Sequence, residues 1–206
     1  MFDFLLFIFA GCFAGVMSGL LGIGGGLVIV PTLTYIFSEH LHVSQDIVMH
    51  LASGTSLCIM IFTSISSVSS NSKKSQKAMT FFREILPFFV LGIIAGGILA
   101  DFMSTYILKK VFGFVVLLVV IEMQFGRMIS KSRIRANRKL DAVVSIIIGI
   151  SSGLLGIGGA FLLIPYLSRK RMQMRTITKV SAFSSVTAGV VGTVVVTVLS
   201  GTCRPA

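Results

Sequence analysis

One stretch of this chain occurs twice, and this repeat limits the folds that the chain can adopt. Residues 15–33 read GVMSGLLGIGGGLVIVPTL, and residues 149–167 read GISSGLLGIGGAFLLIPYL. Both copies are apolar, both are interrupted by clustered glycines, and both carry a proline near the end. A duplicated apolar segment with a glycine break predicts a membrane protein built from two related halves.

The composition places the chain in a lipid bilayer. Hydrophobic residues make up 54% of the 206 residues and charged residues only 12%, which is about half the charge of a typical soluble domain. Residues 85–100 and 111–121 hold no ionisable group, and such runs approach the roughly 20 residues that a membrane-crossing helix needs. We therefore predict an all-α polytopic membrane protein with the lipid bilayer as a partner.

The net charge of +11 does not indicate a nucleic-acid partner, because the basic residues gather in short segments between apolar spans. Cytoplasmic loops of membrane proteins are enriched in Lys and Arg for independent reasons. Residues 71–83, 126–140 and 168–179 are therefore predicted to be cytoplasmic. Segment 38–46 carries two acidic residues and no Lys or Arg, so we expect it on the outer side.

Basic segments flank residues 141–167 on both sides, so this segment is expected to enter and leave the membrane on the same side. Folded in two, it is too short to cross the hydrocarbon core twice. We predict a re-entrant hairpin that turns at residues 156–159, and a similar hairpin in the first copy that turns at residues 22–26. A single kinked crossing is the alternative for both copies.

Three crossings separate the two hairpins, so the second unit would be inverted relative to the first, and the two turns would meet near the bilayer midplane. The predicted units are a first repeat, 1–133, with hairpin 4–37 and helices 47–70, 84–100 and 104–125, and an incomplete second repeat, 134–206, with hairpin 141–167 and helix 179–200.

Small residues spaced by four predict close helix packing; they are Gly11, Gly15 and Gly19 in the first copy and Ser145, Gly149 and Gly153 in the second.

Glycine turns inside a bilayer can bind an anion. Backbone that leaves the helix exposes N–H groups, and the helix that follows points the positive end of its dipole at the same place. The candidate binding residues are Gly22, Gly24, Gly25 and Gly26 in the first turn and Gly156, Gly158 and Gly159 in the second. Pro31 and Pro165 follow the turns; a kink is the simpler interpretation and a gating hinge the sharper one.

A pair of hydroxyl residues follows each turn, Thr55 and Ser56 in the first half and Ser184 and Ser185 in the second. Such hydroxyls either bind the oxygens of a solute or bond to the backbone of their own helix.

Three histidines, His40, His42 and His50, crowd the first outer segment. A metal-dependent membrane enzyme is the alternative that they raise, but without a carboxylate partner they are weak evidence for a site. We expect solvated loop histidines, no metal, no cofactor and no catalytic activity.

The repeated pattern G-x-x-S/G-G-x-x-G-I-G-G-G…V-P-x-L, followed by A-x-G-T-S, resembles the sulfite exporter TauE/SafE family of permeases. The resemblance covers nearly the whole chain. It implies a duplicated four-helix element that moves small sulfur-containing or organic anions across the bacterial inner membrane. It also implies that the glycines of both turns and the two hydroxyl pairs form the solute site.

The chain departs from that pattern in three ways. Ala160 stands where the first copy has Gly26, and Ser184 stands where the pattern has Thr. The second unit is also shorter than the first, so we expect its last two crossings to be missing. The alternative function is therefore a truncated, non-transporting membrane protein or an assembly partner, unless a neighbouring copy completes the unit in a homo-oligomer.

Overall fold

The computed structural model describes residues 8, 11–12, 14–16, 26–39, 44–45, 47–70, 76–129, 138–170 and 172–202, and these ranges hold helices and short connections but no strand. The predicted all-α fold class is confirmed. The helices that the structure bounds are α2 (Gly26–Glu39), α3 (Val48–Ser70), α4 (Gln76–Asp101), α5 (Thr105–Ile129), α6 (Arg138–Leu155), α7 (Ala160–Arg169) and α8 (Met174–Thr202).

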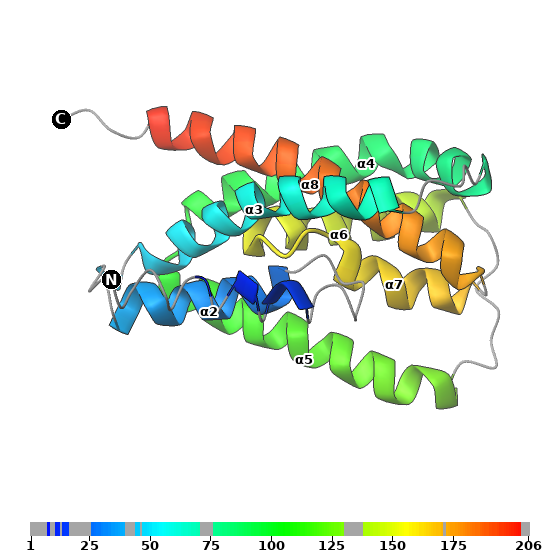
Figure 1. Cartoon of the computed structure of the whole chain (residues 1–206), viewed down its shortest axis with the longest axis horizontal. Helices are drawn as coiled ribbons and strands as arrows, with labels where there is room; N and C mark the ends of the chain where they lie inside the picture. Colours follow the sequence, from blue (N-terminus) through cyan, green and yellow to red (C-terminus); the bar gives the residue numbers. More distant parts are fainter. Residues whose placement is uncertain are drawn as a thin grey trace.

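The helices form one elongated bundle (Figure 1). The last residues of α3, α5 and α7 and the first residues of α4, α6 and α8 lie at one end, which we call the basic end because it carries residues such as Arg169, Lys170 and Arg175. The opposite end holds the last turn of α2 and the first turns of α3 and α5. The segments predicted to be cytoplasmic all adjoin the basic end.

Most helices extend past the predicted apolar spans, and they do so mainly at the basic end. α4 begins at Gln76 rather than at 84, α5 ends at Ile129 rather than at 125, and α8 begins at Met174 rather than at 179. Hydropathy marks only the part of a helix that lies in hydrocarbon. Gln, Lys, Arg and Met are good helix formers, so each helix continues beyond the part that lies in hydrocarbon.

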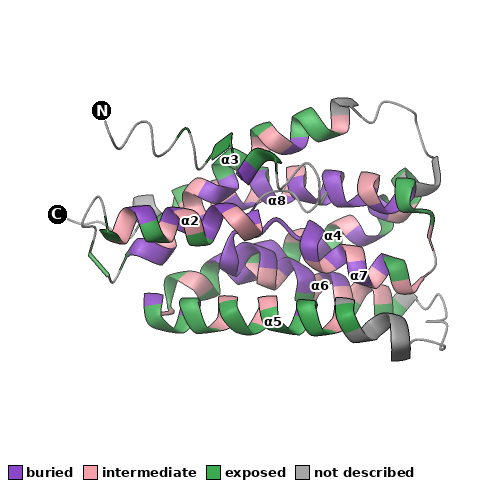
Figure 2. Cartoon of the chain, turned by 60° about the horizontal axis from the view of Figure 1, so that its bottom comes forward, coloured by how far each residue is buried: buried purple, intermediate pink, exposed green. Residues whose placement is uncertain are grey.

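Three helices are long and apolar enough to cross a membrane within the described residues, in the segments Val48–Val68, Met79–Asp101 and Met174–Leu199. Large apolar side chains remain on the outside of the bundle, including Phe62 (76% exposed) and Phe114 (65% exposed). The buried residues gather where α6 and α7 lie inside the bundle, whereas α5 shows many exposed residues along its length (Figure 2). An apolar exterior of this kind is suited to lipid rather than water.

α4 and α6 share the largest helix–helix interface, and glycines allow their backbones to touch. A Cβ added at Gly149 would lie 2.9 Å from Cα of Gly92, and one at Gly153 would lie 3.1 Å from the nitrogen of Gly97. Small residues at such positions let helices approach closely in a membrane, so the predicted packing is confirmed here. At Gly11 and Gly15 an added Cβ would meet no atom of the described residues within 4 Å, so the packing predicted for the first copy stays a prediction.

The segment predicted to form a re-entrant hairpin in the second copy consists of two helices, and its two ends lie at the same end of the bundle. α6 runs from the basic end to residue 155, and α7 runs back from residue 160 (Figure 1). At the basic end, the carboxylate of Asp141 accepts hydrogen bonds from Lys170 and Tyr166. The side chains of Asp141 and Lys170 are only 14% and 9% exposed. This buried contact joins the start of α6 to the end of α7.

α2 and α7 both lead away from the middle of the bundle, but in opposite directions. α7 runs toward the basic end, and α2 runs toward the other end (Figure 1). The two helices have a matched position for proline, since Pro31 and Pro165 are each the sixth residue of their helix. An inverted repeat requires that α2 and α7 run in opposite directions. The repeat itself, with its boundary at residue 133, stays a prediction, because the first glycine turn lies outside the described residues.

We expect Gly149→Leu to destabilise the fold by about 3 kcal/mol, because the larger side chain must force α4 and α6 apart. Thermal unfolding in detergent measures this. Gly113→Leu is the matched control on α5, where an added Cβ meets nothing within 4 Å, and it should change stability by less than about 0.5 kcal/mol. Equal losses in the two variants would contradict the proposed close packing.

We expect Asp141→Asn to cost about 3 kcal/mol in the same assay, because Lys170 is left without its carboxylate in a buried site. The control is Glu122→Gln, which removes the Arg169–Glu122 pair, whose side chains are 37% and 26% exposed. Such a pair is worth less than about 1 kcal/mol. The exchange Asp141→Lys with Lys170→Asp should regain part of the loss; no recovery would argue that the charge pair itself is unimportant.

Candidate functional site

The break between α6 and α7 depends on glycine. Gly156, Gly158 and Gly159 adopt φ angles of 67°, 79° and 56°, which side chains with a Cβ rarely adopt. Ile157 between them is buried, with 1% of its surface exposed. The turn therefore stays inside the bundle and needs glycine at three of its four positions. This is where the repeated motif placed the break.

The start of α2 lies directly against this turn. A Cβ added at Gly26 would lie 2.8 Å from the carbonyl oxygen of Gly156 and 2.8 Å from Cα of Ile157. α2 and α7 both begin here and run in opposite directions (Figure 1). Each helix start carries N–H groups without an intrahelical partner and the positive end of a helix dipole. Two such starts therefore face one small region in the middle of the bundle.

Two serines of the predicted hydroxyl pairs hold the turn. The hydroxyl of Ser56 on α3 donates to the carbonyl oxygen of Gly156 over 3.0 Å, and that of Ser185 on α8 donates to Gly158 over 3.1 Å. Both serines are buried. The structure thus brings α3, α8 and the turn together at the residues that the duplicated motif singled out.

The other member of each pair bonds to its own helix. Thr55 donates to the carbonyl oxygens of Leu51 and Ala52, and Ser184 donates to that of Val180 over 2.9 Å. For these two residues the structure shows the local bonding that was one of the two alternatives. Their membership of a solute site stays a prediction.

The turn itself retains donors. The amide of Gly156 donates to Ser152 O and that of Ala160 to Gly158 O. The amides of Ile157, Gly158 and Gly159 have no hydrogen bond to any other described residue. Buried N–H groups are normally paired, so these three are the groups that an anion could accept hydrogen bonds from.

Two further serines contribute hydroxyls that are available for bonding. Ser152 lies one helical turn before Gly156, and Ser181 lies one turn before Ser185. Both are almost fully buried, at 0% and 1% exposed, and their hydroxyl oxygens have no partner among the described residues. An unsatisfied buried hydroxyl costs about 1–3 kcal/mol. Motif comparison missed both serines, although the four-residue spacing from Gly156 and Ser185 was a usable signal.

No charged side chain reaches the centre of the bundle in the part of the chain that the structure describes. Every buried polar residue there is a serine or a threonine. The ion pairs of Lys170 and Arg169 lie at the basic end. A solute at the turn would therefore meet backbone dipoles and hydroxyls rather than a full charge, as helix-start anion sites allow.

Met60 is a contact that sequence reasoning did not find. It is fully buried on α3, and its side chain fills the space that a Cβ would need at both Gly26 and Gly158. A methionine in an apolar span carries no distinguishing signal. Only its position, four residues after Ser56, places it on the same helix face.

Some predicted residues cannot be placed. Gly22, Gly24 and Gly25, together with His40 and His42, lie outside the described residues. Pro31 and Pro165 lie within helices, and their hinge role stays a prediction. His50 differs from the expected solvated loop residue, because it is half-buried on α3 with its Nε2 2.9 Å from the carbonyl oxygen of Ala100.

The apolar exterior and the long apolar helices define a polytopic membrane protein. The chain matches the family described as sulfite exporter TauE/SafE over residues 7–204. No solved structure matches the chain.

Three relatives carry names of the same kind. A probable membrane transporter protein of Haemophilus influenzae is 30% identical over 194 residues, which is 93% of this chain and 73% of the relative. One of Methanocaldococcus jannaschii is 30% identical over 87% of this chain and 68% of its own length. The probable membrane transporter protein YunE of Bacillus subtilis is 27% identical over 79% of this chain and 66% of its own length. The chain therefore belongs to the TauE/SafE family of membrane transporters.

We expect Ser185→Ala to destabilise the protein by about 1–3 kcal/mol, because the carbonyl of Gly158 loses its buried donor. Ser184→Ala is the matched control on the same helix. It removes a hydroxyl bonded only to its own helix, so its effect should stay within about 0.5 kcal/mol. Thermal unfolding in detergent compares the two, and equal effects would show that Ser185 does not support the turn.

Proposed function

We propose that this protein is a secondary transporter for a small anion, with sulfite or a small sulfonate as its substrate class. The observation that carries the proposal is the approach of Gly26 to the 156–159 turn, which directs two helix starts at one uncharged region. The family is named for sulfite export, and helix starts are a common way for proteins to bind oxyanions. The described residues of this region offer hydrogen-bond donors, as binding of an anion requires.

The proposed solute site combines the residues of both halves. Its backbone comes from the glycines of the two turns, Gly22, Gly24, Gly25, Gly26, Gly156, Gly158 and Gly159, and its hydroxyl side chains are Thr55, Ser56, Ser184 and Ser185. Ser56 and Ser185 act through the turn, since they donate to its carbonyls. The unpaired amides of residues 157–159 then bind the anion.

Transport in this proposal works by alternating access. The turn is enclosed in the described arrangement, with residues 152–161 almost all buried. Movement of one broken hairpin relative to the other opens the site to one side at a time. Pro31 and Pro165 are the proposed hinges. The basic end faces the cytoplasm in the proposed orientation, as positive residues favour, and the membrane is the bacterial inner membrane or its equivalent.

The test is flux of radiolabelled sulfite into liposomes that contain the full chain. Wild type should show saturable uptake, and Gly158→Ala should lower its rate by about tenfold. An alanine at this positive φ costs about 1–2 kcal/mol, and its methyl group would clash with Met60. Gly113→Ala, in open space on α5, is the control for a glycine-to-alanine change.

Two results would count against the proposal in different ways. A folded wild-type protein without saturable flux would favour the non-transporting alternative. Normal flux in Gly158→Ala would show that transport does not use this turn. A size-exclusion profile of each variant in detergent distinguishes loss of function from loss of fold.

A further inference from the structure

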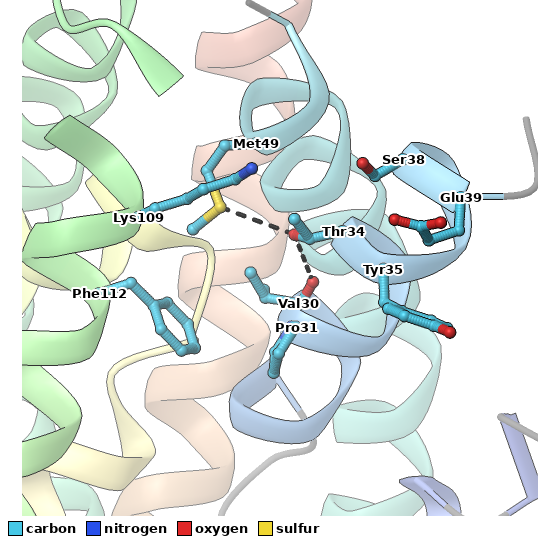
Figure 3. A pocket seen from close by; sticks show the side chains of 9 residues that line it. All are labelled: Val30, Pro31, Thr34, Tyr35, Ser38, Glu39, Met49, Lys109 and Phe112. Atoms are coloured by element: carbon cyan, nitrogen blue, oxygen red, sulfur yellow. Dashed lines mark hydrogen bonds between the residues drawn. The ribbon is translucent and has the colours of Figure 1, made fainter. Parts of the chain in front are cut away.

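A second pocket lies between α2, α3 and α5, away from the glycine turn. It has a volume of about 330 Å³, and two of its lining residues, Ser38 and Glu39, end α2 at the end of the bundle opposite the basic end. Most of its wall is one strip of α2, where Val30, Thr34 and Ser38 follow one another at helical spacing. α3 contributes Met49, and α5 contributes Lys109 and Phe112 (Figure 3).

The pocket carries one cation and one anion on different helices. Lys109 reaches from α5 toward α2, whereas Glu39 lies at the last turn of α2 (Figure 3). These two side chains form no ion pair with each other in the described structure. Lys109 instead donates to the side-chain oxygen of Gln45 over 3.2 Å, so an uncharged amide is the partner that holds its ammonium group beside the pocket.

Gln45 links Lys109 on α5 to Ser38 on α2. Its side-chain nitrogen donates to the hydroxyl of Ser38 over 2.6 Å, while its oxygen accepts from Lys109. The amide therefore bridges the end of α2 and the second turn of α5. An ammonium group held by a neutral partner keeps its full charge available to an anion.

The floor of the pocket is continuous with the candidate solute site. Val30 and Met49 are buried, at 0% and 2% exposed, and they belong to the same apolar cluster as Ile157 of the turn. Val30 also lies one helical turn after Gly26, or about 6 Å along α2. The same helix thus lines the pocket and touches the turn with its first residue.

We propose that this pocket is an entry vestibule, in which Lys109 captures the transported anion before it reaches the glycine turn. The inference rests on the proposed transport function. It adds a charged site outside the glycine turn, where the described buried polar residues are serines and threonines. Glu39 opposes capture, so that the anion is held weakly and can move on. Because a charge near the mouth of a site raises the local concentration of the opposite ion, the vestibule acts on capture rather than on the later steps.

The experiment measures the KM for radiolabelled sulfite in membrane vesicles of both orientations. Lys109→Ala should raise the KM by about threefold to fivefold, and Glu39→Gln should lower it by about twofold, as expected for single exposed charges. Both shifts should occur only when sulfite is added at the face where Lys109 lies. They should shrink at high salt, because exposed charges are screened. Lys109→Arg should restore the KM of wild type to within about twofold.

Lys110→Ala is the matched control. Lys110 is the next residue in the chain and carries the same charge, but its ammonium lies 4.3 Å from the ring centre of Tyr106 and does not line the pocket. Its removal should leave the KM within about 1.5-fold of wild type. The opposite signs expected for Lys109→Ala and Glu39→Gln exclude general damage to the fold as their common cause.

The outcomes separate the vestibule from the transport function. Saturable flux with an unchanged KM in Lys109→Ala, or equal shifts in Lys109→Ala and Lys110→Ala, would overturn the vestibule and leave the transport function standing. Equal shifts from both faces would also overturn it. Absence of saturable flux in folded wild type would overturn the transport function, and the vestibule with it.

Discussion

The structure depends on how the protein satisfies a backbone that is broken inside an apolar bundle. A helix that stops there leaves carbonyl and amide groups which cannot bond to lipid. Glycine provides the positive φ angles of residues 156, 158 and 159, and Ser56 and Ser185 donate to two of the carbonyl groups. Two carbonyls of the turn are thereby paired, whereas the amides of residues 157–159 have no partner among the described residues.

The distribution of charge follows from the same constraint. Ionisable side chains are costly in the membrane interior, and in the described residues they lie near the ends of the bundle, as with Asp141 and Lys170 at the basic end. The buried polar residues of the described bundle are accordingly all serines and threonines, which carry no full charge.

The sequence predicted those features that depend on local chain chemistry. The break at residues 156–159 followed from clustered glycines, and the importance of Ser56 and Ser185 followed from their occurrence after both glycine motifs. The apolar runs predicted the helices. Helix ends were missed by several residues, because α4 and α8 continue through polar residues that hydropathy does not count.

Contacts between distant residues could not be predicted in the same way. Met60 against Gly26, Asp141 with Lys170, and Lys109 beside α2 each depend on how helices are placed in three dimensions. None of these side chains belongs to a repeated motif. Their residue types are also common at helix ends or in apolar cores, so only the packed structure distinguishes them.

The buried Asp141–Lys170 contact has a mechanical consequence for the hairpin of α6 and α7. The two arms are fastened to each other at their open end, while the glycine turn forms the opposite tip, where Ser56 and Ser185 donate to its carbonyls. α7 has ten residues and is therefore about 15 Å long, so a tilt of about 10° about the fastened end displaces the tip by about 3 Å. A small rotation of α7 at the membrane surface would therefore move the glycine turn, which lies beside the start of α2, by about the length of a hydrogen bond.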